Sequence, residues 1–246
     1  MESPRSDPLA NLRHEHKFVY RNCDPRKIET IIEVNNKPVF HAGKESLVNS
    51  IYFDTPDLVS FYENLNGISK RFKLRLRWYD AELPRSLCFF EVKRRMNRVI
   101  AKERYPIALS CPLHRLSLKE LVAGLIRVLP ETPGHLLRLR PEPVVLVRYR
   151  RRHFVVSDIR QQIRLTVDRD ITAVGQLGAA NLRTRMPLQL DGRVILEIKT
   201  AVGGGSHIPR SLRPLRPRLS QFSKYVMCCA LTEGAGGINA SLVRQK

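Results

Sequence analysis

The chain has 246 residues and a net charge of +20, with 43 lysines and arginines against 23 acidic residues. This size suits one large domain or two small ones, and the charge favours an anionic partner: nucleic acid, a membrane surface or a phosphate polymer. No apolar run approaches membrane-spanning length, although 43% of the residues are hydrophobic. The five cysteines form no CxxC pair, which disfavours a disulfide framework or a zinc site and indicates a reduced, cytoplasmic protein.

The first eleven residues are polar, include Pro4 and Pro8 and lack an apolar signal-peptide core, so we expect them to be disordered. Residues 12–232 are expected to form a single domain, followed by a flexible tail over 233–246. Apolar spacing predicts the following strands in chain order: 12–20, 48–54, 69–80, 87–95, 98–108, 144–153, 154–158, 162–170 and 193–200. The predicted helices are 25–34, with Asp24 as N-cap, 57–65, 116–129 and 220–232. The segments 130–143 and 201–219 are predicted as Pro-rich connections, and this order indicates an α+β fold with an antiparallel sheet.

Apolar and cationic residues alternate without a break over residues 72–78. Because successive side chains of a strand point to opposite faces, Lys73, Arg75 and Arg77 share one face. Three cations on one face repel each other unless an anion lies between them. A single strand of this kind would favour a solvated surface, but similar charged rows recur on four more predicted strands, usually with one carboxylate: Arg13, Glu15 and Lys17; Glu91, Lys93 and Arg95; Arg164 and Asp168; Glu197 and Lys199. Five such rows suggest a closed sheet with a polar lumen that holds a polyanion, and carboxylates that hold a metal.

Nine short motifs then occur in a fixed order along the chain. They are Arg-His-Glu-His-Lys-Phe (13–18), Ser-Ile-Tyr-Phe-Asp-Thr-Pro (50–56), Lys-Leu-Arg-Leu-Arg-Trp-Tyr (73–79), Phe-Glu-Val-Lys (90–93), Lys-Glu-Arg (102–104), Tyr-Arg-Arg-Arg-His-Phe (149–154), Arg-Leu-Thr-Val-Asp (164–168), Leu-Glu-Ile-Lys (196–199) and Ser-Lys-Tyr (223–225). In this order they resemble the VTC (vacuolar transporter chaperone) domain of polyphosphate polymerases, which belongs to the CYTH-like triphosphate tunnel metalloenzyme superfamily. The resemblance implies an eight-stranded antiparallel β-barrel with flanking helices, which forms a tunnel for phosphate chains.

The resemblance also implies roles for individual residues. The cations expected to act on the transferred phosphoryl group are Arg75, Arg77, Lys93 and Arg164. The cations expected to bind substrate are Lys17, Lys102, Arg151, Lys199 and Lys224. Glu197 is the implied principal ligand of Mn²⁺ or Mg²⁺, and the helpers or ion-pair partners are Glu15, Glu91, Glu103 and Asp168. Guanidinium groups match phosphate oxygens in pairs, while lysines act as point charges.

The residues themselves leave several of these roles open. Alternation places Lys102 and Glu103 on opposite faces, so only one of them faces the lumen. Glu91 and Glu197 each share a face with a lysine two residues away and could simply neutralise it. Of the three consecutive arginines at 150–152, only alternate ones point inward, and Arg151 fits the motif best.

Three functions remain compatible with the sequence. The first is a metal-dependent phosphotransferase that makes polyphosphate from a nucleoside triphosphate, cytoplasmic but peripheral at a membrane through a separate membrane protein partner. The second is a hydrolase of inorganic triphosphate or of RNA 5′-triphosphate, and the third is a non-catalytic module that binds polyphosphate or nucleic acid. The Tyr-x-Arg-x-x-Phe and Ser-Lys-Tyr motifs favour the polymerase. Cations outside the tunnel, including Arg210, Arg213, Arg216 and Arg218, predict additional weak, non-specific binding of polyanions.

Overall fold

The computed structural model describes residues 13–35, 37–39, 45–81, 83–84, 87–97, 99–109, 111–157, 162–201, 210–215 and 218–233. The N-terminus expected to be disordered, residues 234–246 of the expected tail and much of the predicted connection 201–219 lie outside these residues.

The described residues form long strands with helices between them. The strands are β1 (Arg13–Tyr20), β2 (Lys37–Val39), β3 (Ser46–Asp54), β4 (Lys70–Tyr79), β5 (Leu87–Met96), β6 (Val99–Ala108), β7 (Glu142–Ser157), β8 (Gln162–Gly175), β9 (Leu188–Gln189) and β10 (Val194–Ala201). The α-helices are α1 (Pro25–Asn35), α2 (Val59–Leu65), α3 (Leu118–Val128), α4 (Glu131–Leu139) and α5 (Lys224–Glu233). Two short 3₁₀ helices, η2 (Leu113–Arg115) and η3 (Arg210–Leu215), complete the set.

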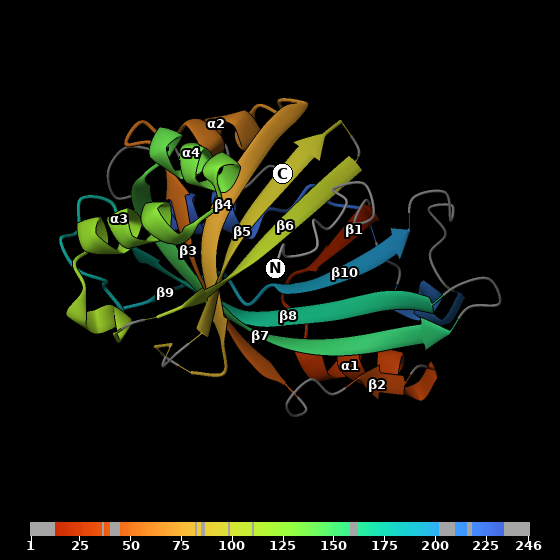
Figure 1. Cartoon of the computed structure of the whole chain (residues 1–246). Helices are drawn as coiled ribbons and strands as arrows, with labels where there is room; N and C mark the ends of the chain where they lie inside the picture. Colours follow the sequence, from red (N-terminus) through yellow and green to blue (C-terminus); the bar gives the residue numbers. More distant parts are fainter. Residues whose placement is uncertain are drawn as a thin grey trace.

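Eight of these strands pair in a ring (Figure 1). Its order is β7-β3-β4-β5-β6-β1-β10-β8, and β8 pairs with β7 to close it. Every pairing is antiparallel, and the short strands β2 and β9 add to the outside of β7 and β8. Within the described residues, a single register pair, Arg13 with Ile100, joins β1 to β6. This architecture confirms the expected α+β fold with an eight-stranded antiparallel barrel.

Several predicted boundaries were wrong. The two strands predicted over 144–158 are one continuous strand, β7, and the predicted strand 162–170 extends to Gly175. The predicted connection 130–143 contains helix α4, in which Pro133 lies in the first turn, where the missing N–H costs no intrahelical hydrogen bond. The helix predicted from residue 220 begins at Lys224.

Helices cover two apolar regions on the outer face of the ring. Helix α3 begins with a capping box between Ser117 and Glu120 and buries Leu121 and Leu125 against the outward residues of β4 and β5, including Leu76. On another side of the ring, the buried isoleucines of α1 pack with outward residues of β1, β8 and β10. Because the apolar rows are buried under helices, strand alternation directs the charged rows into the lumen.

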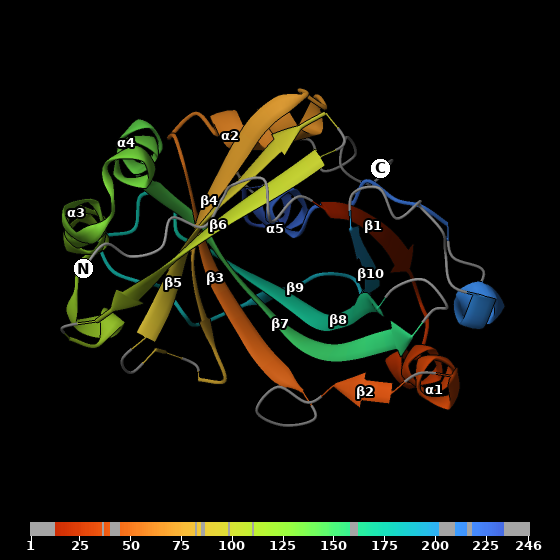
Figure 2. The same cartoon turned by 45° about the vertical axis from the view of Figure 1, so that its right-hand side comes forward.

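Helix α5 lies within the curl of the sheet, close to β7 and β8 (Figure 2). The Tyr225 ring stacks on Tyr52 with centroids 5.1 Å apart, and its hydroxyl donates to the fully buried Asp54. Asp54 also accepts the backbone N–H groups of Ser60 and Phe61, at 2.7 and 3.0 Å. One carboxylate therefore holds the start of α2 and the C-terminal helix together.

Replacing Tyr225 with phenylalanine should lower the free energy of unfolding by about 1–3 kcal/mol, because the buried Asp54 carboxylate loses a donor while the stacked ring stays. Urea denaturation measures this loss. The control is Tyr62→Phe, a change at a ring with 44% exposure on the outside of the molecule, which should stay within about 0.5 kcal/mol. Equal stability of the two variants would contradict the role of the Asp54 contact.

Candidate functional site

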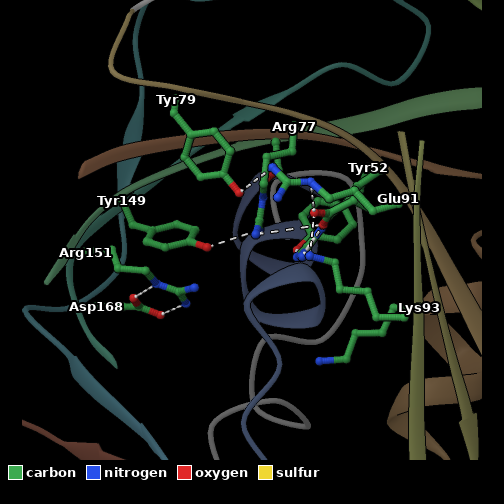
Figure 3. Close-up of polar contacts among 12 residues, drawn as sticks. Tyr52, Arg77, Tyr79, Glu91, Lys93, Tyr149, Arg151 and Asp168 are labelled. Atoms are coloured by element: carbon green, nitrogen blue, oxygen red, sulfur yellow. Dashed lines mark hydrogen bonds and ion pairs between the residues drawn. The ribbon is translucent and has the colours of Figure 1, made fainter. Parts of the chain in front are cut away.

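Two arginines of β4, Arg75 and Arg77, share the inner face of the ring and are held by neighbouring strands; Figure 3 shows Arg77 with Tyr149 and Glu91. Arg75 donates from Nε to Glu91 at 2.7 Å and from Nη1 to the hydroxyl of Tyr52 at 3.0 Å. Arg77 donates from Nη2 to the hydroxyl of Tyr149 at 3.1 Å. Both guanidinium groups are therefore fixed in orientation before any ligand arrives.

Glu91 is fully buried and is the common counter-ion of this wall. Its oxygens lie 2.5 Å from both Arg75 Nη2 and Lys102 Nζ, and 3.5 Å from Arg104 Nε. Burial raises the pKa of Glu91, but the surrounding cations, led by Arg75 and Arg77, lower it far more, so the net pKa lies well below its usual range. Glu91 therefore stays ionised and neutralises cations.

A second carboxylate holds two cations on the opposite wall. Arg151 of β7 donates to Asp168 of β8 from Nε at 2.5 Å and from Nη2 at 2.7 Å. Lys224 Nζ of α5 lies 2.5 Å from the same carboxylate. Burial raises the pKa of Asp168, but Arg151 and Lys224 lower it to about 2. The Asp168 carboxylate therefore positions Arg151 and holds Lys224, at the start of α5, in the lumen.

Strands β1 and β10 supply a third group. Lys93 Nζ donates to Glu15 at 2.6 Å, and Lys17 Nζ donates to the carbonyl of Phe222 at 3.1 Å. Glu197 lies opposite Lys17 in the β1–β10 register, and its ion pairs with Lys199 and Arg151 are long, 3.5 and 3.8 Å. Burial raises the pKa of Glu15, but Lys93 lowers it to about 2; the pKa of Glu197 also lies well below its usual range.

Two predicted residues do not join this cluster. Glu103 lies on the outer face of β6, where it accepts from Arg94 Nε at 2.8 Å and from the hydroxyl of Tyr105 at 2.7 Å. We therefore correct its assignment as a metal ligand: Lys102 faces the lumen, so alternation turns Glu103 away from it. Arg164 shares the face of Asp168 and pairs with Lys199 in register, but its side chain is exposed rather than enclosed with the other cations.

Sequence reasoning assigned no role to several residues of the lumen. Lys73 Nζ donates to the Ser223 hydroxyl at 2.8 Å, and burial together with the nearby Lys17 and Lys93 places the pKa of Lys73 well below its usual range. Alternation already placed Lys73 on the face of Arg75, although no role was assigned to it, and alternation with Lys102 would have placed Arg104 here. Tyr52 and Tyr149 become visible as partners only through the pairing of β3 with β4 and β7.

Cations outnumber carboxylates in the described part of the lumen. The cations are Lys17, Lys73, Arg75, Arg77, Lys93, Lys102, Arg104, Arg151, Lys199 and Lys224, and the carboxylates are Glu15, Glu91, Asp168 and Glu197. Burial and neighbouring cations lower the pKa of Lys17 to about 8. Burial lowers the pKa of Lys102 to about 7, aided by Arg75 and Arg77 and opposed by Glu91. The described part of the lumen therefore has an excess of positive charge that a multivalent anion would neutralise.

A divalent cation fits these residues only with ligands from a bound anion. Among the described residues, no group of three or more His, Cys, Asp or Glu could hold a metal ion. Mg²⁺ and similar hard ions are bound in proteins by one or two carboxylates together with phosphate and water oxygens. Glu197 suits this best, because its ion pairs are long, and Glu15 lies diagonally from it across the β1–β10 pair. Glu91 and Asp168 each have two cations at 2.5 Å, whereas Glu15 has one close cation, Lys93, at 2.6 Å.

The profile of the VTC domain matches residues 12–233. The chain belongs to the VTC domain family. This membership confirms the resemblance that the nine motifs carried, over nearly the whole chain. Within the residues that the structure describes, none of the helices is long and apolar enough to cross a membrane.

Solved structures resemble this VTC domain at low sequence identity. A Hippeastrum protein, described as a candidate adenylyl cyclase with a dominant triphosphatase activity, has a TM-score of 0.43 and 13% identity, over 93% of this chain and 97% of its own. A protein from Pyrococcus horikoshii has a TM-score of 0.41 and 12% identity, over 87% and 97%. A candidate adenylate cyclase from Vibrio parahaemolyticus has a TM-score of 0.40 and 12% identity, over 94% and 98%. Comparison with curated proteins gives no match.

Proposed function

We propose that the tunnel binds the phosphates of a nucleoside triphosphate and of polyphosphate, and that it transfers phosphoryl groups between them with Mg²⁺ or Mn²⁺. The observation that carries this proposal is the enclosed pair Arg75 and Arg77, pre-oriented by Glu91 and two tyrosine hydroxyls and surrounded by lysines. Phosphoryl transfer requires mainly positioning and stabilisation of charge on the phosphoryl oxygens, and two largely buried, fixed guanidinium groups supply both. Membership of the VTC family supports the polymerase type.

Each group has a distinct task in this proposal. Arg75 and Arg77 hold the oxygens of the transferred group, and Lys17 and Lys93 neutralise the phosphates on either side of it. Glu197 and Glu15 would hold the metal, which supplies charge neutralisation at the phosphoryl oxygens when bound. Asp168 keeps Arg151 and Lys224 aimed into the lumen without itself contacting phosphate.

The carboxylates also favour transfer to a phosphate over transfer to water. Burial raises the pKa of each tunnel carboxylate, but neighbouring cations lower it further, to about 2 for Glu15 and Asp168. Groups with such a low pKa are weak general bases at neutral pH, and hydrolysis benefits from a base that takes a proton from water. The end of a phosphate chain carries an oxygen that is already ionised, so its attack needs no such base.

Phosphorus NMR of the purified protein with ATP and Mn²⁺ tests the proposal. Chain-phosphate resonances that grow together with ADP are the expected result, and the variant Arg77→Ala should abolish them. Orthophosphate as the main phosphate product would identify a hydrolase instead. Binding of ATP without any product would leave a binding module and contradict the proposed transfer.

The affinity for inorganic triphosphate should fall as the pH rises from about 7 to about 9. The pKa values of Lys17 and Lys102 without ligand are about 8 and 7, so both lysines lose their protons over this range. Bound phosphate favours the charged lysines and raises both pKa values, so binding at higher pH must take up protons, at a cost of up to about tenfold in affinity per pH unit and lysine. Calorimetry in two buffers with different ionisation enthalpies counts the protons.

The control for this linkage is Lys102→Arg, which keeps the charge but removes one titrating group. Proton uptake at pH 8 should fall in this variant, while uptake by the triphosphate itself remains the same. Equal uptake by the variant and the wild type would show that Lys102 does not titrate on binding.

A further inference from the structure

The inner rows of β4 and β5 end differently at the two ends of the tunnel. Going along β4, residues 71, 73, 75, 77 and 79 share the inner face, and on β5 residues 87, 89, 91, 93 and 95 do so. The register pairs Arg71 with Arg95 at one end and Arg77 with Phe89 toward the other. One end of these rows is therefore formed by two arginines, and the other by the aromatic rings of Tyr79 and Phe89 together with the exposed Leu87.

A third residue completes the aromatic end. The guanidinium carbon of Arg104, from β6, lies 3.5 Å from the centroid of the Phe89 ring and 5.5 Å from that of Tyr79. Its Nη2 donates to the Tyr79 hydroxyl at 3.2 Å. The side chain of Arg104 is 39% exposed, and the two rings are half-buried. We call these three residues the aromatic platform.

Arg104 is not needed merely to neutralise Glu91. Glu91 already has two cations at 2.5 Å, Arg75 and Lys102, and Arg104 is a more distant partner at 3.5 Å. Phosphate chains have no flat apolar surface that could stack on the rings of Phe89 and Tyr79. A guanidinium that lies on one ring and is exposed to solvent resembles the surfaces on which nucleobases stack.

We propose that the aromatic platform binds the nucleobase of the nucleoside triphosphate, so that its phosphates extend past Arg77 and Arg75 into the tunnel. This proposal rests on the proposed function, because it gives that substrate an orientation. The stacked guanidinium and the rings supply π-faces, and the hydroxyl of Tyr79, which accepts from Arg104, can donate to an acceptor on the base. Four residues of strand separate Tyr79 from Arg75, about 13 Å, a span comparable to an extended nucleoside triphosphate.

The proposal gives the tunnel a direction. The nucleotide lies at the end formed by Tyr79, Phe89 and Arg104, and a growing phosphate chain lies toward Arg71 and Arg95. This arrangement separates a partly apolar ligand from a purely anionic one by the chemistry of the two ends.

The test compares two probes, ATP and inorganic triphosphate, each with Mg²⁺, by calorimetry on the full chain. Phe89→Ala removes the ring without changing any charge. It should weaken ATP binding about fivefold to a hundredfold, the range for loss of one stacking contact, and leave inorganic triphosphate within about twofold. Phe89→Trp should retain ATP binding. The control Tyr62→Ala removes an exposed ring of α2 outside the tunnel and should change neither affinity.

The outcomes separate this proposal from the function on which it rests. If the wild type binds neither probe, the proposed function itself fails. If the wild type binds both but Phe89→Ala weakens both equally, or changes neither, the phosphate site stands and the nucleobase platform is wrong. Retained binding of inorganic triphosphate by Phe89→Ala also shows that the variant is folded, and a melting curve confirms it.

Discussion

Glu91→Gln should destabilise the empty protein by about 3–5 kcal/mol, the usual cost of breaking a buried ion pair from one side. The fully buried Glu91 carboxylate faces Arg75, Lys102, Arg77 and Arg104, and the amide leaves these cations without their shared counter-charge. For a protein of this size, the melting temperature should fall by roughly 6–20 °C. Adding inorganic triphosphate should restore most of the loss, because its charges replace the carboxylate at the same guanidinium groups. Differential scanning calorimetry with and without triphosphate measures both effects.

The matched control is Glu103→Gln on the adjacent strand β6. Glu103 makes its ion pair with Arg94 on the outer face, where the two side chains are 26% and 34% exposed, so its loss should cost no more than about 1 kcal/mol. Triphosphate should not rescue this variant selectively. A Glu91→Gln protein that is as stable as the wild type, or that triphosphate fails to rescue, would show that Glu91 is not the counter-ion of the phosphate site.

Glu197→Gln should reduce metal-dependent turnover by at least about a hundredfold and leave triphosphate binding nearly intact. The change removes the carboxylate best placed for the metal, but it also removes a negative charge that repels the polyanion. Arg75→Ala should instead weaken triphosphate binding, with a loss of roughly 1.5–3 kcal/mol of binding free energy, the scale of a charged hydrogen bond. Turnover is measured by release of ADP and affinity by calorimetry, both over a titration of Mn²⁺.

The pair of variants separates two roles that act in one lumen. A Glu197→Gln protein with full turnover would remove Glu197 from the mechanism. Parallel losses of binding in Glu197→Gln and Arg75→Ala would show instead that Glu197 shapes the phosphate site as a whole.

Strand alternation was enough to predict the charged rows, because the apolar rows of the same strands pack under helices and only one face remains for the cations. It could not choose between Lys102 and Glu103, since a shift of one residue exchanges the faces of a whole strand and only the register with β5 fixes it. The sequence could not decide whether Glu91 binds a metal or neutralises cations, because that depends on distances. Two cations lie 2.5 Å from Glu91, which makes it a counter-ion.

Sequence patterns predicted the amphipathic helices and a last helix over 220–232, but they missed α4 and did not indicate where α5 lies. Pro133 and Gly134 concealed α4, although both are tolerated in its early turns. Helix α5 gave no clear apolar stripe, because it is enclosed inside the curled sheet: Cys228 and Cys229 are both fully buried, and Lys224 reaches Asp168. Tyr79, Phe89 and Arg104 lie together only because β4, β5 and β6 pair in register, and a local sequence pattern does not predict this pairing.

The junction between β6 and β1 is the weakest junction of the ring within the described residues. One register pair joins these strands within the described residues, whereas every other junction of the ring runs over at least five. A change of circumference would therefore be taken up at this seam, with little disturbance of the strands that carry Arg75, Arg77 and Glu91. A ring that widens along one line keeps the opposite strands rigid, and amide hydrogen exchange should be fastest along the facing edges of β1 and β6.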